Sequence, residues 1–373
     1  MKILQFGRFY PPDMGGTQQV MYEISEGMTQ DGHTCDVLCS NTKASYEESV
    51  FDKYTVYRTA SYGILLSTSI SPQLLYKLWK IDKNYDLIHV QAPDPLAFLA
   101  LFLVRPTAKV VIHWQSDVVR QKKTLKYFLP LQNWVLSFAD KIVCTTDNYA
   151  HNSPCLQNFQ DKIEVISLGI SNESLISNKK NVEKIKAKYQ NKKIIFALGR
   201  LVSYKGFEYL VESSQYLDDD FIILIGGTGV EKTNLLKIID NNNLHDKVKL
   251  LGYLSAEEKN DYLESCFLFC LPSITKAEAF GVVIAEAMTF SKPIVSTNMQ
   301  NSGVSWVNEH NVTGIQVDSK SAKQLADAFV QLANDKNLYQ KMCEKSWERY
   351  NNFFTREKMI VSLKNLFRSL ITS

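Results

Sequence analysis

The chain has 373 residues, of which 45% are hydrophobic and 22% are charged, and its formal net charge is +3. This length exceeds one ordinary hydrophobic core, so two domains are expected. The composition excludes a disordered chain, and the small net charge excludes the basic footprint of a nucleic-acid-binding protein. Met1 and Lys2 lead straight into a strand-like run rather than a signal peptide. The apolar run 96–104 is too short to span a bilayer.

Short apolar runs alternate with longer stretches of helical period along the chain. This alternation predicts βαβ units, and therefore parallel sheets that are covered on both faces. The final stretch, roughly 320–373, is helical by period. The predicted strands are KILQF, TCDVLCS, TVYRT, DLIHVQ, KVVIHW, KIVCTT and KIEVISLG in a first series and KKIIFALG, FIILIGG, KVKLLG, CFLFCLP and PIVST in a second, and the helices between them include 17–31, 96–104, 205–217, 257–265 and 281–290.

The seven cysteines are odd in number and scattered. Cys35 and Cys39 share a C-x3-C spacing with Cys266 and Cys270, but both pairs lie in apolar runs. We interpret them as core thiols rather than as a zinc site. Free thiols without a secretory signal favour a reducing cytoplasm.

A polar, lysine-rich segment, 171–193, separates the two series of strands. We interpret it as an interdomain linker followed by a solvated helix. The prediction is two doubly wound sheets with a cleft between them. Ligands of such sheets bind beyond the carboxyl ends of the strands, so the loops after each strand are expected to carry the function.

The loop after the first strand reads GRFYPPDMGGTQQV, and it is rich in turn residues. Gly15 and Gly16 precede a helix for which Thr17 is the expected N-cap. Free amides at such a helix start can hold an anion. The alternative is a tight turn without a ligand.

The first loop of the second half reads ALGRLVSYKGFEYLV and places Arg200 and Lys205 five positions apart. Together they could neutralise a diphosphate, although two basic loop residues can also be merely solvated. The later stretch FIILIGGTGVEK resembles a dinucleotide fingerprint, but it fails the G-x-G-x-x-G spacing. NAD binding is therefore not expected.

The stretch ITKAEAFGVVIAEAM carries Glu278 and Glu286 eight positions apart. Because it follows a predicted strand, Glu278 is expected in the loop, with a helix that starts near Phe280. Glu286 then lies about 9 Å further along the helix axis, a separation that suits two hydroxyl-bearing sugars at the ends of a diphosphate. The amides of Phe280, Gly281 and Val282 would face the phosphates. The alternative is a buried helix with two solvated ends.

The motifs GRLVSYKG, EAFGVVIAE and MGGTQQ, in this order and spacing, resemble family 4 of the retaining, nucleotide-sugar-dependent glycosyltransferases along nearly the whole chain. The resemblance implies the GT-B fold, an α/β architecture with two Rossmann-like domains. It implies an N-terminal acceptor-binding domain (1–172), a nucleotide-sugar-binding domain (173–352) and a last helix (353–373) that crosses back to the first domain.

The resemblance also implies roles for single residues. Arg200 and Lys205 would hold the donor diphosphate, Glu278 the donor-sugar hydroxyls and Glu286 the ribose hydroxyls. Gly16 would leave room for the diphosphate. The expected catalytic residues are His113, Arg200, Lys205 and Glu278, and the expected donor-binding residues are Gly15, Gly16, Arg200, Lys205, Glu278, Phe280, Gly281, Val282 and Glu286.

His113, in VVIHWQSD, would sit beside the transferred sugar according to the same resemblance. A lone histidine at a strand end is more often structural. Its expected position after a strand, facing the cleft with Ser116 and Asp117 close by, favours the catalytic interpretation. Ser116 and Asp117 are expected on the acceptor side.

The stretches HWQSDVVRQKK, TTDNYAHNSP and ISLGI resemble a bacterial subgroup that builds lipopolysaccharide O-antigen, capsule and related glycans. The subgroup implies a hexose donor, with GDP-mannose favoured and a UDP-sugar as the alternative, and a polyprenyl-diphosphate-linked or oligosaccharide acceptor. The sequence departs from the family at Ala277, where a small polar residue is frequent before Glu278. Rival functions are a sugar-nucleotide epimerase with the same fold and a non-catalytic sugar-nucleotide-binding scaffold.

No Asp-x-Asp metal motif follows a predicted strand, so we expect transfer without a metal or other cofactor, with fixed positive charge in its place. The segment RQKKTLKYFLPLQNWVLSF could lie on the inner face of a membrane as a basic, aromatic helix, or it could be an ordinary helix with a charged face. Its basic and aromatic residues are Arg120, Lys122, Lys123, Lys126, Tyr127, Phe128 and Trp134.

Overall fold

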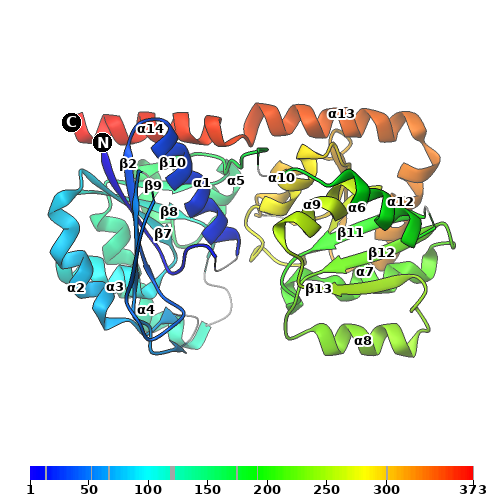
Figure 1. The fold of residues 1–373 in the computed structure, drawn as a ribbon, viewed down its shortest axis with the longest axis horizontal. Coiled ribbons are helices and arrows are strands. Elements are labelled where there is room, and N and C mark those ends of the chain that lie inside the picture. The colour runs from blue at the N-terminus through cyan, green and yellow to red at the C-terminus, as the bar shows by residue number, and fades with distance from the viewer. Residues whose placement is uncertain are drawn as a thin grey trace. The chain divides into compact units, whose positions relative to one another are not determined.

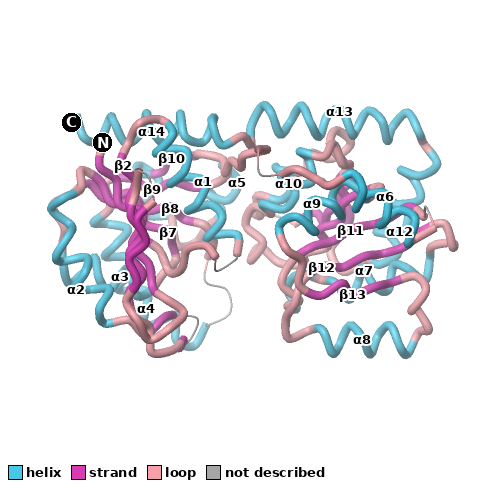
Figure 2. Tube along the Cα trace, in the orientation of Figure 1, coloured by secondary structure: helices cyan, strands magenta, loops and turns pink. Residues whose placement is uncertain are grey.

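The chain folds into two compact α/β units in the computed structural model (Figures 1 and 2). Unit 1 comprises residues 1–170 and 356–373, and unit 2 comprises residues 171–355. The structure describes residues 1–12, 15–51, 53–65, 68–117, 122–173, 175–190, 192–299 and 301–372, with the backbone alone for 122–125.

Unit 1 is built on one sheet with the strand order β10-β9-β8-β7-β1-β2-β4-β3. Its described strands run parallel except β3, which pairs antiparallel with β4 at the edge. The central strand β7 is buried at every position, as expected for a parallel strand covered on both faces. The strands are β1 (Lys2–Phe6), β2 (Thr34–Ser40), β3 (Glu47–Val50), β4 (Thr55–Thr59), β7 (Leu87–Ala92), β8 (Lys109–Trp114), β9 (Lys141–Cys144) and β10 (Ile163–Val165), with a separate hairpin of β5 (Ile64–Leu65) and β6 (Thr68–Ser69).

Helices cover both faces of this sheet. Figure 1 shows α1 and α14 side by side on one side of the sheet, and α2 and α3 on the other. Helix α3 contacts both α2 and α4, so these three form one outer layer. The helices of unit 1 are α1 (Gly16–Gln30), α2 (Pro72–Ile81), α3 (Pro95–Val104), α4 (Lys122–Phe138), α5 (Asp147–Asn152) and α14 (Arg356–Thr372), with 3-10 turns at Asp82–Asn84 and Gln157–Lys162.

Unit 2 is a second doubly wound sheet, with the order β13-β12-β11-β14-β15-β16 and parallel pairing throughout the described residues. Its strands are β11 (Lys193–Leu198), β12 (Phe221–Gly226), β13 (Val248–Gly252), β14 (Leu268–Leu271), β15 (Ile294–Asn298) and β16 (Gly314–Asp318). Its helices are α6 (Lys179–Lys188), α7 (Phe207–Ser213), α8 (Lys232–Asn241), α9 (Ala256–Ser265), α10 (Val282–Thr289), α11 (Val304–Val307), α12 (Ala322–Asn334) and α13 (Lys336–Phe353), with 3-10 turns at Ser203–Lys205 and Ser214–Tyr216.

The lysine-rich segment between the two series forms the predicted solvated helix, α6, in which only Val182 is buried. The structure also shows where this helix is attached. The carboxylate of Asp261 on α9 accepts hydrogen bonds from the Asn178 amide (2.6 Å) and the Asn181 side chain (2.9 Å). From residue 178 onward, the segment is therefore a part of unit 2 rather than a free linker.

The cysteines of both C-x3-C pairs are buried thiols outside any disulfide, as predicted. Burial raises the pKa of the Cys35 thiol to about 12 and that of the Cys266 thiol to about 11. Such thiols are protonated at neutral pH and behave as small apolar side chains.

The last helix, α14, returns to unit 1 and packs on α1, which confirms the predicted crossing of the C-terminal helix. At its start, the Arg356 guanidinium donates to the Glu23 carboxylate (2.5 Å), and both side chains are buried. Gly27 lets the two helices approach closely, because a Cβ there would lie 2.4 Å from a side-chain carbon of Ile360. The two ends of the sequence therefore share one core.

Candidate active site

The predicted donor-site residues lie on loops at one edge of the sheet of unit 2. Since all strands run parallel, the loops after β11, β12, β14 and β15 leave the same edge. The chain runs from β11 outward to β13 in one direction and from β14 to β16 in the other, so the strand order reverses between β11 and β14. Ligands of doubly wound sheets bind at such a reversal.

The loops after β11 and β14 are pressed together at this point. Gly206 adopts a left-handed conformation (φ 64°), and a Cβ there would lie 2.2 Å from the carbonyl oxygen of Pro272. The Ile274 amide also donates to the Tyr204 carbonyl (2.8 Å). Only glycine fits this position, because it combines a positive φ with direct backbone contact.

Lys205 and Glu278 form an ion pair across these two loops. Only 10% of the lysine side chain and 12% of the glutamate side chain are exposed. The Ser273 hydroxyl also donates to the Glu278 carboxylate (3.1 Å). The Arg200 side chain, on the same loop as Lys205, is exposed. The structure therefore brings two of the predicted donor-site residues into contact and leaves the third accessible beside them.

Helix α10 begins at Val282, two residues later than the predicted start near Phe280. Gly281 is its N-cap, in a left-handed conformation (φ 80°), and the Ile284 amide already donates to the Gly281 carbonyl (2.8 Å). The Phe280 ring is buried edge-on against Phe354, with the ring centroids 5.7 Å apart. The free amides at the helix start are those of Val282 and the residue after it, while Phe280 precedes the helix and packs into the core.

Glu286 has a separate partner that sequence reasoning missed. Its carboxylate accepts from the ammonium of Lys259 on α9 (2.7 Å), and 11% of the glutamate side chain and 17% of the lysine side chain are exposed. The two residues are 27 positions apart, and no motif joins them. Each predicted carboxylate is thus neutralised by its own lysine.

The glycines after β12 serve the Arg200 loop rather than a dinucleotide. Gly227 adopts a positive φ of 127°, and a Cβ there would lie 1.9 Å from the carbonyl oxygen of Gly199. A Cβ on Gly229 would lie 2.2 Å from the carbonyl oxygen of Leu201. The Leu201 amide also donates to the Thr228 carbonyl oxygen (2.8 Å). Two backbones touch here, and this contact explains the glycine pattern without a cofactor.

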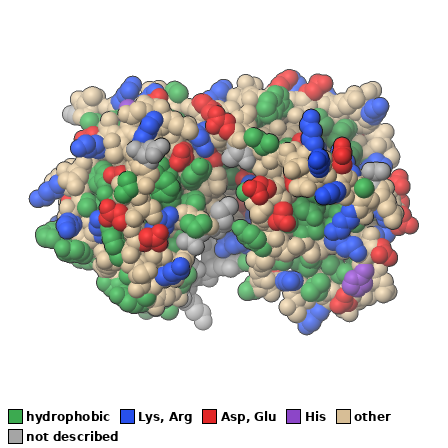
Figure 3. All heavy atoms as spheres, in the orientation of Figure 1, with side chains coloured by type: hydrophobic (Ala, Val, Ile, Leu, Met, Phe, Trp, Pro, Cys, Tyr) green, Lys and Arg blue, Asp and Glu red, His purple; other side chains and the backbone are tan. Residues whose placement is uncertain are grey.

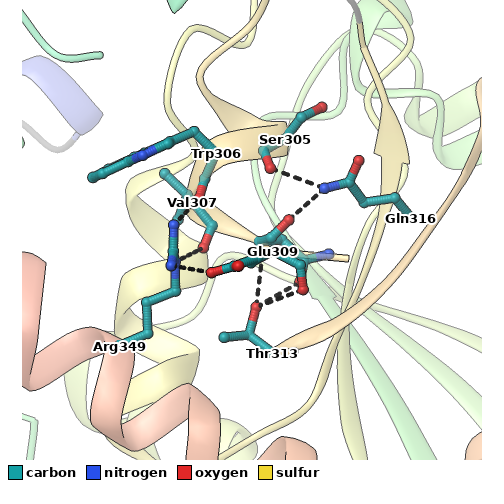
Figure 4. A network of polar contacts seen from close by, with 8 residues as sticks. Ser305, Trp306, Val307, Glu309, Thr313, Gln316 and Arg349 are labelled. Atoms are coloured by element: carbon teal, nitrogen blue, oxygen red, sulfur yellow. Dashed lines mark hydrogen bonds and ion pairs between the residues drawn. The ribbon is translucent and has the colours of Figure 1, made fainter. Parts of the chain in front are cut away.

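Hydrogen bonds from the loop after β15 fix the backbone of the Glu278 loop. The Ser302 hydroxyl donates to the Glu278 carbonyl, and the Gly303 amide donates to the Ala279 carbonyl (2.8 Å). These residues lead into α11, whose C-terminal carbonyls are capped by Arg349 of α13 (Figure 4). Arg349 donates to the Val307 carbonyl (3.0 Å), the Trp306 carbonyl and the Glu309 carboxylate. Helix α13 thereby fixes α11 and, through it, the loop behind Glu278.

In unit 1, the structure corrects the predicted N-cap of the first helix. Helix α1 starts at Gly16, with Gly15 as its N-cap and no side-chain cap, so Thr17 lies within the first turn. A Cβ on Gly16 would meet nothing within 4 Å, whereas one on Gly15 would lie 2.4 Å from the side chain of Gln18. Gly16 therefore has open space beside the helix start. The roles of Gly15 and Gly16 in donor binding stay predictions.

His113 was predicted in the loop after a strand. In the structure it lies inside β8. The side chain is fully buried, and neither ring nitrogen has a hydrogen-bond partner among the described residues. Its ring centroid is 5.2 Å from that of His89. The strand continues through Trp114, so the first loop residue is Gln115, which is half-buried and donates to the Gln91 carboxamide (2.7 Å). The expected position of His113 after the strand was wrong, and its catalytic role stays a prediction without that support.

Asp117 anchors the loop after β8 to α5. Its carboxylate accepts from the Trp114 indole (3.1 Å) and from the Ser153 hydroxyl (2.6 Å), and its amide donates to the Tyr149 hydroxyl (2.5 Å). Ser116 is half-buried beside it. The structure gives Asp117 a structural role, and the acceptor-side role of both residues stays a prediction.

The buried histidines predict that unit 1 loses stability in acid. Burial lowers the pKa of His113 to about 3, from an ordinary value of 6.5, and lowers that of His89 as well. Between pH 6.5 and 3 the unfolded chain binds the proton that the folded chain excludes, so stability is complete above pH 6.5 and falls as the pH drops. For His113, the loss is on the order of 2–3 kcal/mol at pH 4.5.

This prediction is checked by urea unfolding at pH 7.5 and at pH 4.5. We expect His113→Phe to reduce the difference in unfolding free energy between the two pH values, since phenylalanine binds no proton in either state. His151→Phe, at an exposed histidine of α5, is the matched control and should leave the difference unchanged. An identical pH dependence in the wild type and in His113→Phe would contradict the prediction.

The segment expected to lie on a membrane is only partly described. Arg120 lies outside the described residues, as do the side chains of Lys122 and Lys123. Lys126 and Tyr127 are exposed on α4. Phe128 packs inward instead, because its ring stacks on the buried Phe98 (5.6 Å between centroids), whereas the half-buried Trp134 lies edge-on to the partly exposed Phe102 (4.9 Å). Phe128 therefore fits the interpretation as an ordinary helix of the domain, and the expected membrane role of the segment stays a prediction.

Two absences hold for the described part of the chain. None of its helices combines the length and the apolar character that crossing a bilayer requires. None of its His, Cys, Asp and Glu side chains gather in groups of three or more that could hold a metal ion.

Solved structures share this architecture along the whole chain. Sucrose-phosphate synthase from Thermosynechococcus elongatus gives a TM-score of 0.82 at 18% identity and covers 100% of both chains. The crystal structure of Anabaena HepE in complex with UDP-glucose gives a TM-score of 0.79 at 18% identity and covers 99% of this chain and 100% of that one. Two doubly wound units and the returning C-terminal helix define the GT-B fold.

Family models and curated relatives identify the family. Residues 14–174 match the model described as Glycosyltransferase Family 4, and residues 178–349 match the model described as Glycosyl transferases group 1. The O-antigen chain mannosyltransferase C of Escherichia coli is 26% identical over 100% of both chains. D-rhamnosyltransferase WbpZ of Pseudomonas aeruginosa is 26% identical over 95% of this chain and 92% of its own. The chain belongs to glycosyltransferase family 4.

Proposed function

We propose that the protein transfers a hexose from a nucleotide-diphosphate sugar to a lipid-linked or glycan acceptor in the biosynthesis of a bacterial surface polysaccharide. The transfer retains the anomeric configuration and needs no metal. GDP-mannose is the favoured donor, and a UDP-sugar is the alternative. The protein works in the cytoplasm, at the inner face of the membrane that carries the acceptor.

The observation that carries this proposal is the Lys205–Glu278 pair with Arg200 on the same loop, at the strand-order reversal of unit 2. A departing nucleoside diphosphate develops negative charge, which preorganised cations stabilise. The Lys205 ammonium and the Arg200 guanidinium supply two such cations. The N-terminus of α10, which follows Glu278, adds a positive helix end.

In the proposed mechanism, the diphosphate binds between these cations and the start of α10. Lys205 then shares its charge between the phosphate and Glu278, whose freed carboxylate oxygen accepts from a donor-sugar hydroxyl. Glu286, held by Lys259, binds the ribose hydroxyls. The bond from the anomeric carbon to the diphosphate breaks, and the acceptor hydroxyl attacks from the same face. Its proton leaves with the diphosphate oxygen.

The names of the relatives support the substrate class. One 26%-identical relative is named for mannosyl transfer in O-antigen chains and another for D-rhamnosyl transfer. These names favour a hexose donor and a glycan acceptor. The UDP-glucose bound to HepE, which shares the fold at 18% identity, is the reason to keep a UDP-sugar as the alternative.

A thermal-shift panel of GDP, UDP, GDP-mannose and UDP-glucose tests the donor. A ligand that binds only the folded chain stabilises it by about 2.7 kcal/mol at a hundred times its Kd, so the correct nucleotide should raise Tm by several degrees. We expect GDP and GDP-mannose to shift Tm most. An equal shift by all four ligands, or none, would contradict the proposal.

Turnover separates the rival functions. Incubation of the matching donor with membrane extract in the presence of EDTA should release the nucleoside diphosphate, and the product linkage should keep the donor's anomeric configuration by NMR. Conversion of the donor sugar without any acceptor would indicate the epimerase. A clear Tm shift with no donor consumption would indicate the non-catalytic scaffold.

A further inference from the structure

The outer helix α3 of unit 1 exposes an apolar surface without any polar residue. Its ten residues read PLAFLALFLV, and three of its large side chains face solvent: Leu99 is 39% exposed, Phe102 36% and Leu103 58%. A helix that is apolar all round is normally buried or lies in a membrane. Helix α3 is neither inside the core nor long enough to cross a bilayer.

The neighbouring helix α2 extends this surface. Helices α2 and α3 contact one another, and α2 exposes Tyr76 (58%) and Trp79 (63%), whose rings lie 6.0 Å apart. Figure 3 shows hydrophobic side chains gathered at the outer margin of unit 1, on the side where Figure 1 places α2 and α3. Exposed apolar side chains gathered on two neighbouring helices are typical of an interaction site. We call Tyr76, Trp79, Leu99, Phe102 and Leu103 the α2–α3 face.

The short hairpin β5–β6 adds two apolar side chains next to this face. It lies in the connection that follows the carboxyl end of β4, and β6 contacts α3. Ile64 and Leu65 are each 62% exposed. Since the carboxyl ends of the strands form the ligand-binding edge, the apolar surface reaches the edge at which substrates are expected.

Helices α2, α3 and α4 themselves carry charges of one sign, and the Lys77 ammonium of α2 pairs with the Glu48 carboxylate of β3 (3.7 Å). Helices α2, α3 and α4 together contain 37 residues (10 + 10 + 17) and not one Asp or Glu. The whole chain has 39 Asp and Glu in 373 residues, so about four would be expected in these helices. Lys80 and Lys83 at the end of α2, Arg105 after α3 and Lys126 on α4 are exposed. Exposed apolar and aromatic side chains flanked by cations match an anionic lipid surface.

We propose that the α2–α3 face docks the protein on an anionic bilayer. Trp79, Leu103 and the hairpin enter the headgroup region, and the lysines contact lipid phosphates. This placement differs from the basic helix expected from the sequence, since the docking surface is formed chiefly by α2 and α3 rather than by α4. The docking proposal rests on the proposed function, in which the acceptor is bound to a membrane, because docking would bring the ligand-binding edge of unit 1 to the lipid. Each lysine near the surface is worth about fivefold in partitioning at low salt.

The test is flotation of the purified full-length chain with vesicles of phosphatidylcholine alone and with one-third phosphatidylglycerol. We expect binding to the anionic vesicles only, weakened by high salt. Trp79→Glu with Leu103→Glu should lower the partition coefficient at least tenfold, and Lys80→Gln with Lys83→Gln about 25-fold. These side chains are exposed, so the variants should keep the wild-type Tm.

Val361→Glu is the matched control, because Val361 is 50% exposed on α14, across the sheet from the α2–α3 face. It should bind vesicles like the wild type. Wild-type binding to neither vesicle, or unchanged binding of both double variants, would overturn the proposal. So would a wild-type dimer that the Trp79→Glu and Leu103→Glu pair dissociates, since the face would then join two copies. Donor-induced Tm shifts should be the same in every variant, so failed docking is distinguishable from failed donor binding.

Discussion

Replacing Lys205 with methionine is expected to lower kcat/KM for donor turnover by about 10²–10³-fold. The Lys205 ammonium is held against Glu278 by a backbone that only glycine permits at position 206, so the charge is in place before the donor arrives. Methionine keeps the length and apolar character of the stem and removes the cation alone. The effect should fall mainly on kcat, because charge on the leaving diphosphate is greatest in the transition state.

The pair between Lys205 and Glu278 makes a double-mutant cycle informative. Lys205→Met leaves a nearly buried carboxylate without its cation, so part of the loss reflects Glu278 and not the diphosphate. Glu278→Gln should itself lower kcat/KM, and the double variant should lose less than the product of the two single losses. Lys237→Met, at an exposed lysine of α8 in the same unit, is the control and should leave kcat/KM unchanged. Full activity of Lys205→Met would contradict the proposed role.

The sequence was sufficient to predict which loops carry the site, because parallel strands fix where loops emerge. Arg200, Lys205 and Glu278 were placed on post-strand loops, and the structure puts those loops at one sheet edge. The partner of Glu286 was not predictable in this way. Lys259 reaches it from α9, which a strand separates from α10 along the chain, and no local pattern encodes that contact.

The error over His113 has a related cause. Strand periodicity indicates that KVVIHW is extended, but it does not reveal how deep a residue near the end of the strand lies. Strands β7 and β9 flank β8 at His113, and the His113 ring is fully buried 5.2 Å from the ring of His89 on β7, which in turn lies 5.2 Å from Phe367 of α14. The unpredicted strand β16 reads GIQVD, which is short and interrupted by a polar residue. The unpredicted strand β3 is an exposed edge strand with two glutamates. Such segments acquire strand structure from pairing rather than from their own pattern.

The second large expected effect is a loss of folding stability when α14 is detached from unit 1. Arg356→Met is expected to destabilise unit 1 by about 3–5 kcal/mol, because it leaves the Glu23 carboxylate buried without its guanidinium. The pair joins the start of α14 to α1 across 333 positions of sequence. Burial of Leu363 and Phe367 further along α14 depends on the same docking. Urea unfolding with hydrogen exchange of the α1 peptides measures the loss in unit 1 itself.

Lys364→Met provides the matched control on the same helix. Lys364 pairs with Asp31, the C-cap of α1, at 2.9 Å, but 34% of the Asp31 side chain is exposed, so the loss should stay below about 1 kcal/mol. Hydrogen exchange in α12 of unit 2 should be unchanged in both variants, since neither residue belongs to that unit. Equal stability losses in Arg356→Met and Lys364→Met would mean that the buried pair adds nothing beyond a surface contact. A large difference, confined to unit 1, would show that the last helix is a structural element of the first unit and that truncation before residue 356 would expose its core.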